Sequence, residues 1–216
     1  MGLLDITVKK LDNPTEGHVE EAVQIFCKLM QEDPLAIALT GGDMLILPYL
    51  IRAMVGAIAF MCGDIYAAFN EHGAMVGFQG WVPPGKLLFS TEEQRERLED
   101  FNVRLSDKAK EYFPKAMGVD FPKAIDDCTG IENCELNAYW CNFNFVVAEY
   151  QQRGISKAMS ELAYQKAKPH KWIMALATTH VRNIAIYNHL RFELMGYRNM
   201  ASPFIDWPAW IYMRRT

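Results

Sequence analysis

The stretch from residue 139 to residue 167 constrains the fold most strongly, because it joins a strand signal to a helix signal through a glycine-containing turn. Aromatic and β-branched residues dominate residues 139–147, which is typical of a central strand. Apolar residues then recur at helical spacing from Ile155, and Pro169 ends the run. We therefore predict a buried strand, a short polar turn and an amphipathic helix that begins beside Gly154.

A strand that leads into a helix in this way forms a binding site for anions. The first N–H groups of a helix have no partner within the helix, and the helix dipole adds partial positive charge at the same end. Gly154 lets the main chain come close to a ligand, and the Ser156 hydroxyl is placed to donate to a phosphate. The turn is therefore predicted to bind a pyrophosphate group.

The spacing Gln-x-x-Gly-x-Ser in this turn resembles the Gln/Arg-x-x-Gly-x-Gly/Ala signature of the GCN5-related N-acetyltransferases, the GNAT superfamily. A second segment, from Asn183 to Tyr187, resembles the family's Asn-x-x-Ala-x-x-x-Tyr signature, which precedes Gly-Phe. Here the alanine lies two residues after Asn183, and Arg191 replaces the glycine before Phe192. A buried strand is predicted between the two segments, over residues 172–177. The order strand, helix, strand, helix supports the resemblance over residues 139–192.

The resemblance implies an α/β (α+β) fold with a central mixed, mostly antiparallel twisted sheet of six to seven strands flanked by helices. The segments outside the two signatures follow that plan. From the N-terminus we expect a strand, two helical regions, a hairpin and a last strand pair, over residues 5–10, 19–30, 43–61, 65–69 with 74–81, and 193–197 with 209–213.

The length of 216 residues fits a single domain, residues 1–216, and no Pro/Gly/Ser-rich linker divides it. Residues 85–132 have no counterpart in the order of elements that the family resemblance implies. We therefore predict that they form an insertion with at least one helix. The four residues from Ser90 to Glu93 form a candidate capping box for that helix. An insertion of this length is either a lid over the site or a helix packed on the outside, and the sequence leaves both open.

The resemblance implies acetyl-CoA as cofactor, with coenzyme A as product. In the family the pyrophosphate binds to main-chain N–H groups of the turn. The fourth strand splays from its neighbour, and pantetheine pairs with the freed edge as an added strand does. An N–H near Asn144 or Phe145 is then expected to donate to the thioester oxygen, and Asn183 to contact pantetheine or cap its helix. The expected cofactor-binding residues are Asn144, Phe145, Val146, Val147, Gln151, Gln152, Arg153, Gly154, Ile155, Ser156, Lys157 and Asn183.

Tyr187 is the expected general acid that protonates the departing thiolate. A phenol and a thiol are both weak acids, so the proton transfer is not steeply uphill. The alternative is a packing role, because Tyr187 shares a helical face with Ile184 and Leu190.

The general base is less well determined by the sequence. Glu135, near the start of the fourth strand, is the expected base, because the family often has a carboxylate or a water there. Other candidates remain open: Glu149, His180, Glu71, or a water chain held by Asn142 and Asn144.

The implied activity is acetyl transfer from acetyl-CoA to a primary amine of a small molecule, by direct attack in a ternary complex. No cysteine lies within either signature, which argues against a covalent acetyl-enzyme. Aromatic and methionine residues in the first half favour an apolar or aromatic amine. A protein or peptide N-acetyltransferase and a non-catalytic acyl-CoA-binding protein remain as alternatives.

The composition limits the binding partners and the cellular compartment that we expect for this protein. A net charge of −4 without a basic run argues against nucleic acid. Five cysteines without metal-ligand spacing argue against a metal site and favour a reducing, cytoplasmic setting. Residues 44–62 are almost long enough to span a membrane, but Pro48 and Arg52 favour a buried helix instead. The sequence leaves a homodimer open.

Overall fold

The computed structural model describes residues 6–216, so Asp5 of the predicted first strand lies outside the described residues. Within residues 6–216, seven strands form one sheet in the order β1-β2-β3-β4-β5-β7-β6, and of the neighbouring pairs only β4 and β5 run parallel. The predicted mixed, mostly antiparallel sheet is therefore confirmed. Its strands are β1 (Thr7–Lys10), β2 (Asp64–Phe69), β3 (Met75–Val82), β4 (Tyr139–Val146), β5 (Met174–Thr178), β6 (Glu193–Met200) and β7 (Trp207–Arg214).

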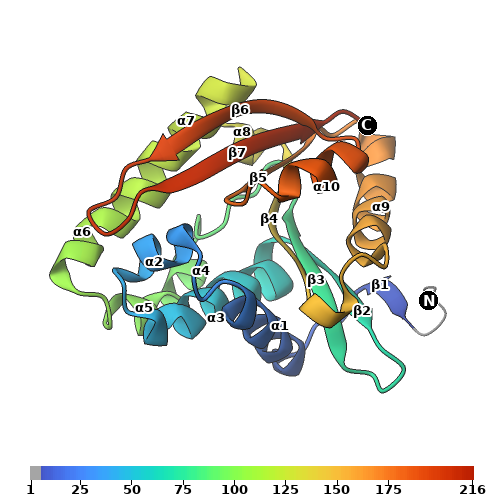
Figure 1. Ribbon diagram of the computed structural model, residues 1–216, viewed down its shortest axis with the longest axis horizontal. Coiled ribbons are helices and arrows are strands. Elements are labelled where there is room, and N and C mark those ends of the chain that lie inside the picture. The colour runs from blue at the N-terminus through green and yellow to red at the C-terminus, as the bar shows by residue number, and fades with distance from the viewer. Residues whose placement is uncertain (1–5) are drawn as a thin grey trace.

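Helices cover both faces of the sheet (Figure 1). One face packs against α9 (Ile155–Ala167) and α10 (Asn183–His189). The opposite face packs against α1 (Glu16–Leu29) and α3 (Leu47–Ala57) over β2 and β3, and against α7 (Phe121–Thr129) over β5 and β7. In Figure 1 the red strands β6 and β7 run across the top, away from the teal β2 and β3.

α1 ends at Leu29, close to the end of the predicted helical region 19–30, and the Asp33-Pro34 pair then starts a helix that was not predicted, α2 (Pro34–Thr40). The Asp33 carboxylate accepts hydrogen bonds from the main-chain N–H of Leu35 at 2.9 Å and of Ala36 at 3.4 Å. Proline at the first helical position adds a preset φ angle. The Asp33-Pro34 dipeptide therefore supplies both the cap and the first residue of α2.

The apolar segment Met44–Cys62 forms a continuous helical run of η2 (Met44–Ile46), α3 and η3 (Ile58–Cys62). It is long and apolar enough to cross a membrane by length and composition alone, and 56% of its most apolar 18-residue stretch is buried inside the molecule. Arg52, near its middle, forms an ion pair with Glu20 of α1. In this structure the run packs as a core helix, as the sequence analysis expected.

Residues 85–132 fold into several short helices rather than one long one. Thr91 caps α4, accepting a hydrogen bond from the N–H of Gln94 at 3.3 Å. The helices that follow β3 are α4 (Glu92–Glu96), α5 (Glu99–Asn102), α6 (Asp107–Lys115), η4 (Ala116–Asp120), α7 and α8 (Cys134–Asn137). Ile125 of α7 is fully buried against the sheet, so the segment contributes to the core as well as to the surface.

The feature that positions the site is the separation of β4 from β5. The two strands pair over only three residues, Tyr139–Cys141 with Met174–Leu176. A bulge follows at once, where Asn142 is an extra residue opposite β3. The bulge reverses the side-chain alternation: Cys141 packs in the cluster beside α9, whereas Phe143 packs in the cluster beside α1. Past the bulge β4 keeps β3 as its neighbour, and its other edge opens into a cleft.

Candidate functional site

The turn between β4 and α9 presents a row of free N–H groups. Among residues 6–216, the structure shows no acceptor for the main-chain N–H groups of residues 152–157. Gly154 is the residue before the helix and has φ +80°, a conformation that favours glycine. Gln151 holds the turn in place, since its Nε2 donates to the carbonyl of Val146 at 2.9 Å. The turn therefore has the unpaired donors that a pyrophosphate needs.

The side chain of Ser156 faces the sheet rather than the open turn. Its Oγ donates to Oδ1 of Asn144 at 3.0 Å, so the structure does not show this hydroxyl free for a phosphate. Gln79 of β3, which the sequence analysis did not single out, donates through Nε2 to the same Asn144 oxygen at 3.0 Å and to the Ser160 hydroxyl at 2.9 Å. This buried network joins β3, β4 and α9 and fixes the Asn144 side chain.

The free edge of β4 exposes alternate main-chain groups to the cleft. The N–H of Val147 donates to the carbonyl of Val76 on β3 at 2.9 Å. Because antiparallel pairs alternate, Phe145 also bonds to β3, while the N–H groups of Asn144 and Val146 point the other way. Of the two donors that the sequence left open, Asn144 is the one directed at the cleft.

Tyr187 of α10 lies against this edge. Asn144 Nδ2 is 3.4 Å from its hydroxyl, and the side chain is buried. Burial, with a smaller contribution from Cys141, raises the pKa of Tyr187 above its ordinary value. The hydroxyl is therefore protonated at neutral pH, as a general acid must be.

The second signature keeps its shape despite its departures from the family pattern. Arg191 adopts φ +62°, the left-handed conformation that glycine takes most easily. The Asn183 side chain donates to the Thr178 hydroxyl at 2.9 Å and does not cap α10. Asn183 lines the cavity together with Tyr187, which places both beside the cleft.

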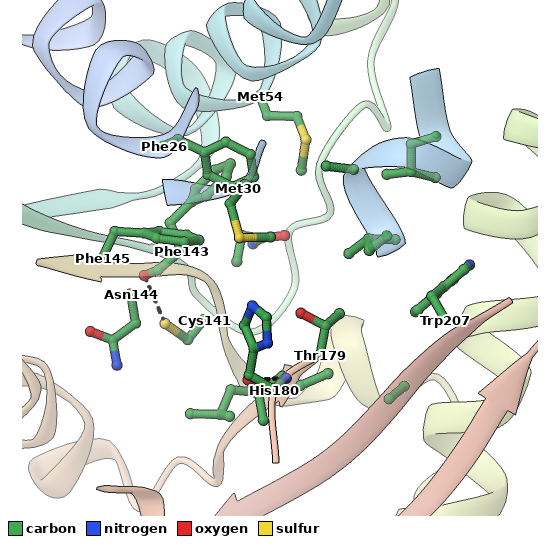
Figure 2. A pocket seen from close by; sticks show the side chains of 18 of the residues that line it. Phe26, Met30, Met54, Cys141, Phe143, Asn144, Phe145, Thr179, His180 and Trp207 are labelled. Carbon is green, nitrogen blue, oxygen red and sulfur yellow. Dashed lines mark hydrogen bonds between the residues drawn. The ribbon is translucent and has the colours of Figure 1, made fainter. Parts of the chain in front are cut away.

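The buried carboxylate of Asp33 contacts His180, which follows the end of β5. Asp33 Oδ2 lies 3.1 Å from His180 Nε2 and accepts a 2.6 Å hydrogen bond from the Thr179 hydroxyl. The Asp33 side chain is 1% exposed and the His180 side chain 32%. In Figure 2 the imidazole points from the end of β5 toward Met30, between Cys141 and Thr179. His180 thus lines the cavity beside β4, and Asp33 contacts it from the start of α2.

His180 was one of the candidate bases predicted from the sequence, whereas Asp33 was not predicted. The signal at Asp33 was ambiguous, because an acidic residue before proline is also a common helix cap. The two residues are 147 positions apart, and only the fold brings them together.

A cavity of about 170 Å³ lies between the helices α1, α2 and α3 and the strands β4, β5 and β7. Its walls are mainly apolar, with Phe26, Met30 and Met54 facing β4 in Figure 2. The polar residues that line it are Glu135, Asn142, Asn144, Thr178, Thr179, His180, Asn183 and Tyr187.

The four candidate bases occupy different places. Glu135 and His180 line the cavity, and burial together with the nearby Asp126 carboxylate raises the pKa of Glu135 to about 7. Glu149 is exposed and lies 3.5 Å from Lys28, and Glu71 is exposed beside His72 in the hairpin. The structure therefore brings two of the four candidates to the cavity.

No protein-family model matches the sequence, and no curated protein matches it. Solved structures do match over almost the whole chain. A Corynebacterium glutamicum protein described as histone acetyltransferase HPA2 and related acetyltransferase is 16% identical, with a TM-score of 0.62 and 96% of each chain covered. A Drosophila melanogaster polyamine N-acetyltransferase is 12% identical, with a TM-score of 0.62 and 98% of this chain and 100% of that chain covered.

An arylalkylamine N-acetyltransferase 7 of the yellow fever mosquito, described as putative in its structure report, is 14% identical, with a TM-score of 0.63 and coverage of 97% of this chain and 87% of that chain. At these identities the likeness shows the fold. The chain therefore has the fold of the GNAT acetyltransferases, which confirms the fold that the two signatures implied.

Proposed function

We propose that this chain, which has the GNAT fold, is an acetyl-CoA-dependent N-acetyltransferase that acts on a small primary amine by direct attack. The observation that carries the proposal is that three features lie along β4 and at its end. These are the free N–H groups of residues 152–157 in the turn that follows the strand, the open edge of β4, and the cavity lined by Tyr187 and His180, whose imidazole contacts Asp33.

The residues present fit the cofactor. The unpaired N–H groups at the start of α9 match a pyrophosphate, and the outward N–H groups of Asn144 and Val146 match the amides of pantetheine. Acetyl-CoA, when bound, supplies the acetyl thioester. The N–H of Asn144 then polarises the thioester carbonyl, and Tyr187 protonates the leaving sulfur.

His180 is the base that we assign to the amine. A primary amine is mostly protonated at neutral pH, so it must lose a proton before it attacks. His180 accepts that proton through its ring, and the Asp33 carboxylate stabilises the charged imidazolium at 3.1 Å. The arrangement is that of a base oriented by a carboxylate.

Glu135 is the base that the family resemblance suggested, but its position in α8, before β4 begins, favours His180 as the base. Asn144 is five residues beyond Tyr139, which amounts to about 16 Å of strand at ~3.3 Å per residue. Glu135 precedes the strand altogether. Its carboxylate therefore lies toward the opposite end of β4 from the polarising N–H.

The cavity suits a small molecule. Its volume of about 170 Å³ is close to that of protein cavities that hold one benzene molecule. The mainly apolar walls favour an acceptor with an apolar body and its amine at the His180 end. All five cysteines are free thiols, which supports the cytoplasm as the place of the reaction.

Thiol release from acetyl-CoA in the presence of a panel of small amines tests the proposal. We expect turnover with at least one amine, and a loss of about 10²-fold or more in kcat for His180→Gln and Asp33→Asn. Asparagine is as good a helix cap as aspartate, so the second variant keeps α2. His72→Gln, in an exposed His–Glu pair at 3.5 Å, is the matched control and should behave as wild type. Binding of coenzyme A without turnover on any amine would contradict the proposed reaction.

A further inference from the structure

A run of hydrogen bonds leads from the buried interior of β3 to the hydroxyl of Tyr187. Gln79 is fully buried, and its Oε1 accepts a hydrogen bond from the indole Nε1–H of Trp81 at 2.9 Å. The Nε2 of Gln79 donates to Oδ1 of Asn144 at 3.0 Å. Nδ2 of Asn144 then lies 3.4 Å from the Tyr187 hydroxyl. The run therefore connects the proposed acid to a part of the sheet that is closed to solvent.

Two groups beside Gln79 can form hydrogen bonds in only one way. An indole N–H donates and never accepts, so the atom of Gln79 that faces Trp81 is its oxygen. A main-chain carbonyl only accepts, so the atom of Gln79 that lies 3.2 Å from the carbonyl of Ser156 is its nitrogen. Both contacts require the same orientation of the Gln79 amide. Its nitrogen therefore faces Asn144.

The orientation of Gln79 determines the orientation of Asn144. The Asn144 oxygen accepts hydrogen bonds from Gln79 Nε2 and from the Ser156 hydroxyl, each at 3.0 Å. The Asn144 nitrogen is left to face Tyr187, and an amide nitrogen only donates. The phenol oxygen of Tyr187 therefore accepts at this contact. Within residues 6–216 the structure shows no acceptor for the phenol proton, and Tyr187 lines the cavity.

We propose that Gln79 and the Asn144 side chain are positioning residues, which keep the proton of Tyr187 free for the leaving sulfur. This inference rests on the proposed function and adds to it the groups that orient the acid. Tyr187 gives its proton to the sulfur as the C–S bond breaks and the electron pair of that bond stays on sulfur. Asn144 Nδ2–H then donates to the phenolate, which regains a proton from water. The same amide thus orients the phenol before the step and stabilises its negative charge after it.

The opposite orientation of Asn144 has a different consequence for Tyr187. An amide oxygen in this place would accept the phenol proton and withhold it from the sulfur. The two orientations also differ in their effect on the pKa of Tyr187, because a donor stabilises the phenolate and an acceptor stabilises the phenol. Burial raises the pKa of Tyr187, and the hydrogen bond from Asn144 opposes that larger effect. Loss of the Asn144 amide should therefore raise the pKa under the proposal and lower it in the opposite orientation.

Titration of position 187 tests the direction of this hydrogen bond without turnover. A polyfluorinated tyrosine incorporated at that position titrates at a lower pH than tyrosine, within the range in which proteins stay folded. Asn144→Leu has a side chain of similar shape that cannot donate, and it should raise the pKa of the fluorinated phenol by about one unit. Gln79→Met should raise it less, because the Ser156 hydroxyl still bonds to Asn144. A fall, or no change, in Asn144→Leu would overturn the inference.

Ser160→Ala is the matched control for these two variants. The Ser160 hydroxyl is buried and bonds to Gln79 Nε2 at 2.9 Å, but it lies outside the run from Trp81 to Tyr187. Its loss should leave both the pKa of the fluorinated phenol and kcat as in the wild type. A shift as large as that of Gln79→Met would contradict a directed run of hydrogen bonds.

Turnover separates positioning of the acid from a merely structural role. We expect Asn144→Leu to lower kcat for thiol release about tenfold and to leave the affinity for coenzyme A unchanged. In a Tyr187→Phe background the same substitution should have no further effect, because no phenol proton remains to be oriented. An equal loss in both backgrounds would overturn the inference. A raised pKa in a protein that acetylates no amine would refute the proposed reaction and keep the oriented phenol, whereas turnover with a lowered pKa would do the reverse.

Discussion

At the scale of single residues, the hydroxyl of Tyr187 is the group whose removal is most informative. Tyr187→Phe removes the proposed proton donor and leaves the buried ring in place. We expect kcat to fall by about 10²-fold, with the affinity for coenzyme A unchanged. Stopped-flow detection of the free thiol measures the first quantity, and calorimetry the second.

Tyr212 provides the control for this substitution. Its ring lies 5.3 Å from that of Tyr187, and within the described residues its buried hydroxyl forms no hydrogen bond. Tyr212→Phe should therefore retain full turnover. Equal activity of both variants would remove Tyr187 from the role of acid.

Glycine is required at position 154 by the backbone conformation, φ +80°, and not by lack of space. A β-carbon built at this position meets no atom within 4 Å. Gly154→Ala should cost about 1–2 kcal/mol of unfolding free energy, the penalty for an L-residue in the left-handed region. It should also weaken coenzyme A binding by about tenfold, since relief of the strain turns the N–H groups away from the ligand.

Gly85→Ala separates the two effects. Gly85 has φ +84° and equally free surroundings, but it lies in the loop after β3. This variant should lose similar stability in urea unfolding and bind coenzyme A as the wild type does. A Gly154→Ala protein with unchanged affinity would show that the turn is not the pyrophosphate site.

At the scale of elements, the open edge of β4 should respond to the cofactor in an alternating pattern. The N–H groups of Asn144 and Val146 point into the cleft, whereas that of Phe145 bonds to β3. Addition of coenzyme A should slow hydrogen exchange at Asn144 and Val146 and change Phe145 little. Residue-resolved exchange by NMR measures this, and uniform or absent protection along β4 would contradict pantetheine pairing.

The elements themselves could largely be predicted from the sequence, because each carries a local signal. The mainly apolar runs of β2 and β3, the aromatic run in β4 and the apolar stripe of α9 all lie where predicted. The helix α2 was missed because its cap residue, Asp33, also reads as a stop. Local periodicity shows where a helix is interrupted, but not whether the chain resumes one.

The site was only partly predictable for a different reason. Main-chain donors follow from local geometry, so Gly154 and its turn could be identified from spacing alone. Asp33 contacts His180, and Gln79 contacts Asn144, only because segments far apart in the sequence pack together. Local sequence patterns do not reveal such contacts. The bulge at Asn142 carries no distinct sequence signal, although it decides which residues face the cleft.

At the scale of the whole molecule, Asp64 joins the first strand to α9. Its carboxylate is 6% exposed, lies 3.1 Å from Lys10 Nζ, accepts a hydrogen bond from the Tyr139 hydroxyl at 2.8 Å, and pairs with Lys166. Burial alone would raise the pKa of Asp64, but the hydrogen bonds from Lys166 and Tyr139 outweigh it, so the pKa is lowered.

This pKa shift sets the pH range of the stabilisation. A carboxyl group with a lowered native pKa stabilises the fold fully above its unfolded pKa of about 4, and the effect is lost as the pH falls through the native value. Asp64→Asn should therefore cost about 2 kcal/mol of unfolding free energy at neutral pH and progressively less below pH ~4. Exposed Asp12→Asn should cost little at any pH. A loss that does not depend on pH would contradict the ionic role of Asp64.

The central claim is that the free N–H groups of residues 152–157 and the open edge of β4 together bind acetyl-CoA. A crystal structure of the protein with coenzyme A tests it most directly. We expect the pyrophosphate oxygens within about 3 Å of those N–H groups, and pantetheine paired with the main chain of Asn144 and Val146. A nucleotide bound elsewhere, or the turn closed by its own side chains in the presence of saturating coenzyme A, would contradict the claim.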